Sequence, residues 1–308
     1  MTMAIADSDK LAPKRIALFG MDCLFTASIV RSLLATPVAN ITAMVLPRTE
    51  EAQAPKSSWA SQFKALDNVS IIGLSQRSEL TSHGFLSTFA TLEIDVIVVA
   101  CFPWRLPSAV RALPTIVSVN VHPSRLPDGR GPEPIFWSFR RDLDTAGVTL
   151  HAIDDGLDTG PIIDQRSVAI PSDATMITLE RSLAQIGADM LCDFLSGPLH
   201  SIAAWPQPAD EGRSAPFPRA EDLIVTTSWQ VATAARFINA VSPVYGPIEV
   251  LILATGQRLA VAEVLNVENS TAAASAVRLQ EDHAWIRFPD GLLHCRVRPV
   301  HRHLAIQI

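Results

Sequence analysis

Three polar side chains of this sequence are of the types, and at the spacing, that acid–base chemistry needs. Asn120 and His122 are separated by one residue at the end of a Val-rich segment, and Asp158 lies in a later Asp-Thr-Gly turn. An amide and an imidazole can both donate a hydrogen bond to an oxygen that gains negative charge, and a carboxylate can orient an imidazole or accept a proton. We therefore expect Asn120, His122 and Asp158 to form one catalytic site.

The strands expected around these residues explain how they would meet. Segment 116–122 has the composition of a buried strand, and alternation along it places Asn120 and His122 on one face at its C-terminal end. Open α/β sheets bind ligands at that end of their strands. Asp158 follows a second strand-like run, 147–153, so a turn would bring its carboxylate beside the imidazole.

Strands and helices alternate through the N-terminal part of the chain. Strands are expected at 15–19, 41–46, 69–73, 95–101, 116–122 and 147–153, and helices at 25–35, 85–92, 107–113, 134–141 and 175–195. This alternation is typical of an α/β fold, with a Rossmann-like, doubly wound and mostly parallel sheet. The turn after the first strand lacks the Gly-x-Gly-x-x-Gly spacing, so a dinucleotide cofactor is disfavoured.

A Pro-rich segment indicates a boundary between two domains. Four prolines lie between Trp205 and residue 218, with a glycine and several charged residues. We predict a catalytic domain at 1–205, a linker at 206–218 and a C-terminal domain at 219–308. In the last of these, a helix is expected at 229–241 and strands at 248–253, 259–267, 284–288 and 292–297, which favours a small β-rich, barrel-like domain.

The motifs around the three polar residues resemble one known family. The run from Asn120 to Pro134 reads Asn-x-His-x-Ser-x-Leu-Pro-x-x-Arg-Gly-x-x-Pro, and it is followed by Gly-Val-Thr-Leu-His at 147–151 and Gly-Leu-Asp-Thr-Gly at 156–160. This compound pattern resembles the 10-formyltetrahydrofolate-dependent formyltransferases over residues 14–195, and more faintly over 215–299. The layout is most similar to the methionyl-tRNA enzymes of that family. The resemblance implies the formyltransferase fold and catalytic roles for the matching Asn, His and Asp residues.

The resemblance also implies where the folate co-substrate binds. In the family, the pterin lies beside the loop after the strand that matches 95–101, and beside the segment before the catalytic Asp. An apolar pocket with few polar anchors fits such a ligand. Trp104 is equally well explained as a core residue. The residues expected to contact 10-formyltetrahydrofolate are Phe102, Trp104, Arg105, Leu106, Ile153, Asp154 and Asp155.

The charge pattern bears on the formyl acceptor. Phosphate neutralisation supplies most of the affinity of tRNA-binding proteins, but this chain has a net charge of −6, and its four lysines all precede residue 65. From Asp210 onward, the sequence contains nine arginines and ten acidic residues. The loop at 47–56 also departs from the basic loop of the methionyl-tRNA enzymes. We therefore expect a small amine as acceptor, such as an amino sugar or an amino-acid-derived amine or hydroxylamine.

Other acceptors and other activities stay open. Methionyl-tRNA is the alternative acceptor, whereas DNA is not an expected partner. Water in place of the amine would give a formyltetrahydrofolate hydrolase, although Asn120 argues against this because the hydrolase relatives tend to lack the matching Asn. A non-catalytic folate-binding module is a further alternative. The three polar residues argue against it, because a protein that only binds folate has no need of them. The residues expected to line the acceptor entrance are Arg125, Asp128, Arg130 and Glu133.

The sequence leads us to expect a soluble, cytoplasmic protein. Residues 1–14 contain no apolar run long enough for a signal peptide, and no window approaches the length of a membrane span, so no membrane partner is expected. The four cysteines have no Cys-x-x-Cys spacing, which argues against a zinc site or a disulfide framework. We predict reduced, mostly buried thiols and no metal.

Overall fold

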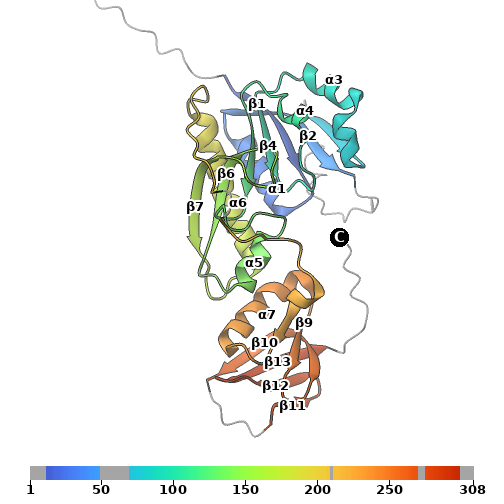
Figure 1. Ribbon diagram of the computed structural model, residues 1–308, viewed down its shortest axis with the longest axis vertical. Helices are drawn as coiled ribbons and strands as arrows, with labels where there is room; N and C mark the ends of the chain where they lie inside the picture. Colours follow the sequence, from blue (N-terminus) through green and yellow to red (C-terminus); the bar gives the residue numbers. More distant parts are fainter. Residues whose placement is uncertain (1–11, 49–68, 209–210, 270–274, 299–308) are drawn as a thin grey trace, which may run out of the picture. The chain divides into compact units, whose positions relative to one another are not determined.

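The computed structural model describes residues 12–48, 69–208, 211–269 and 275–298 (Figure 1). Most of the loop at 47–56 therefore lies outside the described residues. The chain divides into two compact units: Met1–Pro132, Gly147–Ser167 and Glu180–Ser214 form the first, and Glu133–Ala146, Val168–Leu179 and Ala215–Ile308 the second. Two short segments of the N-terminal part thus belong with the C-terminal unit. The domain boundary at 206–218 stays a prediction.

A seven-stranded sheet is the centre of the first unit. Its strands lie in the order β3-β2-β1-β4-β5-β6-β7. Each of the neighbouring pairs from β3 to β5 is parallel, whereas β6 runs antiparallel to β5. The predicted α/β fold with a mostly parallel sheet is therefore confirmed. The strands are β1 (Lys14–Gly20), β2 (Ala39–Pro47), β3 (Ser70–Leu74), β4 (Val96–Ala100), β5 (Val117–His122), β6 (Thr145–Ala152) and β7 (Ile162–Ala169).

Apolar side chains along the central strands form the core. All five residues of β4 are buried, as expected for a parallel strand covered on both faces. Phe19 of β1 contacts Phe89 of α3, with ring centroids 5.7 Å apart, and Phe89 stacks on Phe85 at 4.6 Å. Phe102, in the loop after β4, meets Phe19 edge-on at 5.3 Å. This aromatic cluster joins the core to the loop at the carboxyl end of β4.

The helices begin and end close to where the sequence predicts them. Ser82 caps α3 by accepting a hydrogen bond from Phe85, and Pro134 occupies the first turn of α5, where a missing N–H carries no cost. The helices are α1 (Leu24–Ala35), α3 (His83–Thr91), α4 (Ser108–Arg111), α5 (Pro134–Arg140), α6 (Met176–Ser196) and α7 (Val231–Tyr245), with 3-10 turns at Arg77–Thr81 and Ala220–Leu223.

The second unit contains a six-stranded sheet in the order β11-β12-β13-β10-β9-β8. Helix α7 packs on it: Ser242 donates to the carbonyl of Ala262, and the side-chain oxygen of Asn239 accepts from the backbone of Val264. The predicted β-rich C-terminal part is confirmed. Its strands are β8 (Ile224–Thr226), β9 (Ile248–Ile252), β10 (Gln257–Glu268), β11 (Val277–Gln280), β12 (His283–Arg287) and β13 (Leu292–Arg298).

All four cysteines are reduced thiols, and none is strongly exposed. Cys295 is buried, and Cys23, Cys101 and Cys192 are partly buried. Cys23 and Cys101 follow strand ends, where packing against the sheet is incomplete.

Candidate active site

The structure brings the three predicted catalytic side chains together in the first unit. The Asn120 side-chain nitrogen donates to Oδ1 of Asp158 at 3.2 Å, and Nδ1 of His122 lies 3.8 Å from Oδ2 of Asp158. The backbone N–H of Gly131 also donates to Oδ2, at 2.9 Å. The side chains of His122 and Asp158 are only 7% and 11% exposed. An amide, an imidazole and a carboxylate therefore converge in a nearly buried cluster.

The turn that carries Asp158 is held by its own side chains and by close backbone packing. Asp158 has a left-handed φ of 54°, which a carboxylate-bearing residue tolerates better than most. Oδ1 of Asp154 accepts a hydrogen bond from the Thr159 hydroxyl at 2.7 Å. A Cβ at Gly160 would lie 1.8 Å from the carbonyl oxygen of Ala152, so only glycine fits there. The motif residues around Asp158 thus fix the carboxylate in place.

His151 is a member of this cluster that the sequence analysis missed. It lies opposite Asn120 in the β5–β6 register, and its Nε2 is 3.2 Å from the Asn120 side-chain nitrogen. Nδ1 of His151 is 2.9 Å from the carbonyl oxygen of Ala152, which can only accept, so Nδ1 carries the proton. Burial, and then the nearby His122, lower the pKa of His151 to about 4. A neutral His151 therefore accepts a hydrogen bond from Asn120.

His122 is oriented from the opposite side by the loop that follows it. Its Nε2 lies 2.9 Å from the carbonyl oxygen of Gly129, so Nε2 is a donor. Nδ1 then faces the carboxylate of Asp158. This arrangement leaves Nδ1 as the ring atom that exchanges protons or hydrogen bonds with the site.

A second missed residue, Gln207, lies in the Pro-rich segment and supports the cluster from behind. Its amide nitrogen donates to the carbonyl oxygens of Asp158 at 2.9 Å and Gly160 at 2.8 Å. Its oxygen accepts from Nε of Arg130 at 3.1 Å and from a terminal guanidinium nitrogen at 2.8 Å. A single side chain therefore ties the Asp158 turn to Arg130.

Comparison with known proteins identifies the family. The profile of the formyl transferase family matches residues 24–195 of the sequence, the stretch that contains the whole cluster. The chain belongs to this family.

Named relatives of this chain agree with the family assignment. A methionyl-tRNA formyltransferase of Syntrophus aciditrophicus is 34% identical over 187 residues, which cover 60% of this chain and 59% of that protein. The methionyl-tRNA formyltransferase of Aromatoleum aromaticum is 31% identical over 239 residues, 77% of this chain and 75% of that protein. The matched part thus spans less than two thirds of the Syntrophus protein.

Solved structures show the same fold at low sequence identity. WlaRD, a sugar 3N-formyl transferase solved in the presence of dTDP and 5-N-formyl-THF, has a TM-score of 0.62 at 15% identity, with 94% of this chain and 98% of that chain covered. An N-formyltransferase from Helicobacter canadensis, in complex with folinic acid and dTDP-3-aminofucose, has a TM-score of 0.60 at 14% identity, with coverages of 93% and 100%. The formyltransferase fold therefore extends over both units of the chain.

The apolar residues predicted to contact folate belong to one core cluster or pack against it. Leu106 belongs to the core cluster beside β4, and Phe102, Trp104 and Ile153 pack against that cluster while staying partly exposed. Phe102 meets Trp104 edge-on at 5.5 Å. The two loops thus present half-exposed aromatic and aliphatic edges beside backbone polar groups, which fits a flat heteroaromatic ligand.

Two of the three charged side chains predicted at the folate site, those of Asp154 and Asp155, have protein partners. Asp154 closes the Asp158 turn, and Asp155 is ion-paired with Arg111. Arg105 is exposed, and its carbonyl oxygen accepts a hydrogen bond from Arg77 at 3.2 Å. Direct folate contacts from these three side chains stay a prediction.

The predicted acceptor-binding residues divide between the two units. Arg125 and Asp128 are exposed in the first unit, where the Asp128 carboxylate accepts from the backbone of Arg213 at 2.9 Å. Glu133 belongs to the second unit and hydrogen-bonds Tyr245, whose pKa is raised by burial and by this carboxylate. Among the described residues, no group of three or more His, Cys, Asp or Glu side chains could hold a metal. No described helix is long and apolar enough to cross a membrane.

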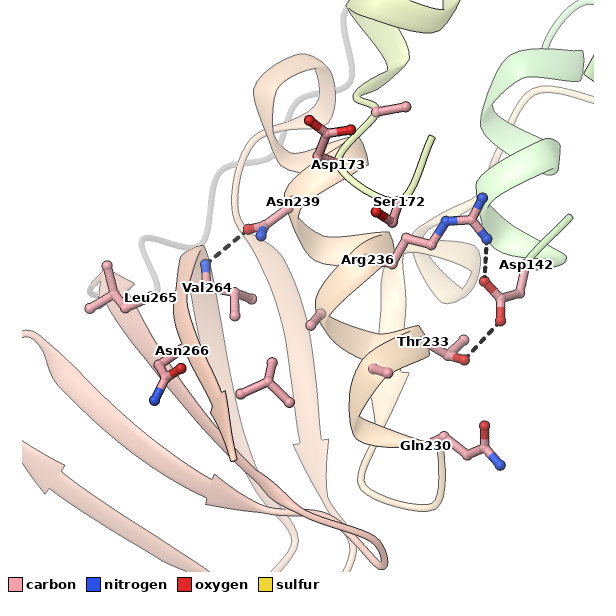
Figure 2. Close-up of a pocket in the computed structure, with 14 residues that line it drawn as sticks. Asp142, Ser172, Asp173, Gln230, Thr233, Arg236, Asn239, Val264, Leu265 and Asn266 are labelled. Carbon is pink, nitrogen blue, oxygen red and sulfur yellow. Dashed lines mark hydrogen bonds and ion pairs between the residues drawn. The ribbon is translucent and has the colours of Figure 1, made fainter. Parts of the chain in front are cut away.

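The second unit contains a hollow of about 700 Å³ with a mixed polar and apolar lining, and none of the predicted site residues lines it (Figure 2). Figure 2 shows Arg236 of α7 reaching Asp142, with a nitrogen–oxygen distance of 2.6 Å. The other carboxylate oxygen of Asp142 accepts from Thr233 at 2.8 Å. Arg236 also donates to the carbonyl of Leu143 at 2.8 Å. These contacts fasten α7 to the turn after α5, so the arginine has a structural role.

Proposed function

We propose that this formyltransferase transfers the formyl group of 10-formyltetrahydrofolate to the amino group of a small amine. The convergence of Asn120, His122 and Asp158 in one nearly buried cluster supports this proposal. The acceptor would be an amino sugar or an amino-acid-derived amine or hydroxylamine. Membership of the formyl transferase family supports the same chemistry.

Asn120 and His122 would stabilise the oxygen that gains negative charge as the amine attacks. Both hydrogens of the Asn120 amide have acceptors at 3.2 Å, one on His151 and one on Asp158. A ligand oxygen could replace Asp158 as one of these acceptors and leave the hydrogen bond to His151 in place. Preorganised donors of this kind contribute about 10²–10³ in kcat.

Asp158 would hold the proton that the attacking amine loses. Its Oδ2 lies 3.8 Å from Nδ1 of His122, so a proton could pass between the two groups directly or through a bridging water. The Gly131 N–H on the same oxygen keeps the carboxylate from rotating. Proton transfer by a positioned side chain adds about 10²–10⁴ in rate.

10-Formyltetrahydrofolate would supply an activated one-carbon group when it is bound. Phe102, Trp104, Leu106 and Ile153 are the side chains that would hold its ring system, because Leu106 is part of the core cluster and the other three pack against that cluster while staying partly exposed. Asn120 is paired with Val99 in the β4–β5 register, and β4 leads directly into the loop of Phe102. The proposed folate loop and the proposed oxyanion donor therefore share one edge of the sheet.

The arginines of the second unit support a small acceptor over tRNA. Four of them are ion-paired with acidic residues: Arg219 with Glu221, Arg236 with Asp142, Arg258 with Glu249, and Arg296 with both Glu263 and Asp282. The acidic partners offset the positive charge of these arginines, which lowers the attraction of this surface for the phosphates of tRNA. An acceptor without a polyphosphate backbone fits this surface better.

Methionyl-tRNA is the second candidate acceptor. The named relatives are methionyl-tRNA formyltransferases, and one of them is 31% identical over 77% of this chain. Sequence similarity at this level supports shared chemistry more strongly than a shared acceptor.

Release of tetrahydrofolate, followed by absorbance, separates these activities. The reaction is run without acceptor, with a panel of amino sugars and amino-acid-derived amines, and with methionyl-tRNA. We expect turnover only with a small amine, and its loss in His122→Ala. Turnover with methionyl-tRNA alone would favour the second candidate, and turnover without acceptor would indicate a hydrolase. Folate binding without any turnover would contradict formyl transfer to the acceptors tested.

A further inference from the structure

Two thiols lie side by side at the carboxyl edge of the first sheet. Gly20 and Ala100, the last residues of β1 and β4, are register partners. Cys101 directly follows β4, and Cys23 caps the N-terminus of α1 shortly after β1. The side chains of Cys23 and Cys101 are hydrogen-bonded to each other. The parallel pairing of β1 with β4 therefore makes neighbours of residues that are far apart in the sequence.

Thr26 forms a cradle for the sulfur of Cys23. Its hydroxyl donates to the carbonyl oxygen of Ala100 at 2.8 Å and lies 3.4 Å from the sulfur of Cys23. The Thr26 backbone N–H points to the same sulfur, with a nitrogen–sulfur distance of 3.5 Å. A Cβ at Gly20 would lie 2.4 Å from the Thr26 side chain, so the strand end is packed tightly against this cradle. The cradle holds the Cys23 sulfur in one place.

The surroundings stabilise the thiolate of Cys23. The hydrogen bond from Cys101 and those from Thr26 lower the pKa of Cys23 to about 7, although burial acts in the opposite direction. Burial raises the pKa of Cys192, and it raises that of Cys295 to about 12. A helix N-terminus also favours negative charge. Cys23 thus differs from Cys192 and Cys295 in two ways: its sulfur accepts hydrogen bonds, and the pKa of its thiol is lowered and not raised.

The conformation of Cys101 adds a further distinction. Its φ of 57° is in the left-handed region, which side chains other than those of Asn, Asp and His adopt rarely. Such backbone strain persists only where surrounding contacts impose it, and it is common at functional sites. Both thiols are also partly accessible to solvent, so a small oxidant can reach them.

We propose that Cys23 and Cys101 form a reversible, peroxide-sensitive dithiol site. The Cys23 thiolate attacks one oxygen of hydrogen peroxide, the O–O bond breaks, and Cys23 sulfenic acid and water form after proton uptake. Cys101 loses its proton and attacks the sulfenic sulfur, which expels hydroxide and gives the Cys23–Cys101 disulfide. Two thiols and one peroxide thus yield one disulfide and two waters. A dithiol reductant restores the reduced pair by exchange.

The disulfide would affect the loop that begins at Cys101. That loop carries Phe102 and Trp104, to which the proposed function assigns folate contacts, so this consequence rests on the proposed function. Tying Cys101 to the N-terminus of α1 restricts the loop, and we expect weaker folate binding in the oxidised protein. The dithiol chemistry itself does not depend on the reaction that the enzyme catalyses.

Peptide mass spectrometry of the full chain tests the site without any substrate. The reduced protein is treated with stoichiometric hydrogen peroxide at neutral pH, in the presence and absence of a sulfenic-acid trap. The wild type should yield a linked pair of peptides, containing Cys23 and Cys101, that a dithiol reductant separates. Cys101→Ser should accumulate trapped sulfenic acid at Cys23, and Cys23→Ser should leave Cys101 unmodified. Cys192→Ser is the matched control and should behave like the wild type.

Rates of alkylation provide a second measurement that needs no disulfide. At neutral pH, Cys23 should react roughly five- to tenfold faster than Cys192, because its larger thiolate fraction outweighs its lower intrinsic nucleophilicity. Equal rates at the two cysteines, or a linked pair that lacks Cys23, would overturn the proposal. Linked peptides in a protein that shows no formyl transfer would leave the dithiol site standing and reject only the proposed function.

Discussion

Asn120 and His151 face each other across β5 and β6, and the side-chain nitrogen of Asn120 lies 3.2 Å from Nε2 of His151. Since Nδ1 of His151 donates to the carbonyl of Ala152, Nε2 is left with a lone pair. That lone pair selects the amide orientation in which the nitrogen of Asn120, and not its oxygen, points into the cluster. A neutral histidine thus sets the direction of the proposed oxyanion donor.

This relationship makes the stability of the first unit depend on pH. The pKa of His151 is about 4 in the folded protein and about 6.5 in an unfolded chain. The unfolded state therefore binds the proton more readily, and folding free energy is lost as the pH falls from about 6.5 towards 4. Wild type should lose about 2–3 kcal/mol more than His151→Gln between pH 7 and 4.5. Urea unfolding at both pH values measures the difference, and equal losses in the two proteins would contradict it.

Replacing Asn120 should affect catalysis more than binding. Asn120→Ala removes one donor to the developing negative charge, so kcat should fall by about 10²–10³ with little change in KM. Steady-state kinetics with the best acceptor of the panel measures both constants. Asn40→Ala, on the exposed part of β2, is the control and should match the wild type. A variant of Asn120 with an unchanged kcat would exclude the proposed role.

Gln207 should act as a positioning residue through its two donated hydrogen bonds. Gln207→Glu keeps an oxygen for Arg130 but removes both donors to the carbonyls of Asp158 and Gly160. Because the Asp158 turn would then be more mobile, kcat should fall roughly tenfold. Arg130→Ala breaks only the other half of the network and should lower kcat less.

The difference in kcat between Gln207→Glu and Arg130→Ala tests this role of Gln207. Kinetic constants are measured across pH, because a displaced carboxylate changes the pH profile, whereas a simple loss of stability does not. Gln185→Ala removes an exposed hydrogen bond to Asp189 on α6 and serves as the control. An Arg130→Ala variant as slow as Gln207→Glu would show that the arginine, and not the turn, is what Gln207 supports.

Arg236 should contribute to the stability of the second unit. Its side chain is 15% exposed, and it pairs with Asp142 at 2.6 Å while donating to Leu143. Arg236→Met leaves the Asp142 carboxylate and a carbonyl without this partner, so unfolding free energy should fall by about 2 kcal/mol. Arg258→Met removes a pair with Glu249 from a side chain that is 54% exposed, and the loss should stay within about 0.5 kcal/mol. Denaturant unfolding of both variants compares them directly.

The sequence predicts elements well where apolar runs are long. Strand β4 is a continuous run of Val and Ile that ends in Ala100, and β5 has Val at every second position, so both patterns indicate a strand. Strand β7 was not predicted, because Ile162–Ala169 carries charged and polar residues, and only Ile162 is buried. Strands β8 and β11 were missed because they are short and contain no fully buried run.

The candidate site also contains residues that the sequence predicts and residues that it does not. Asn120, His122 and Asp158 can be recognised because they lie in motifs with fixed spacing. His151 joins them only because β6 runs antiparallel to β5, and its strand pattern does not reveal that direction. Gln207 lies in a Pro-rich segment without periodicity, and its role depends on tertiary contacts alone.

The support that Gln207 gives to Asp158 limits where this chain can be cut or recombined. A fragment that ends at Trp205 would keep every strand of the first sheet, yet it would lack the side chain that holds the Asp158 turn. It would also lose the carbonyl of Arg213, which accepts from Gly129 at 2.7 Å, beside His122. Chimeras that exchange C-terminal halves between formyltransferases should therefore retain catalytic activity when the crossover follows Ser214, and lose much of it when the crossover precedes Gln207.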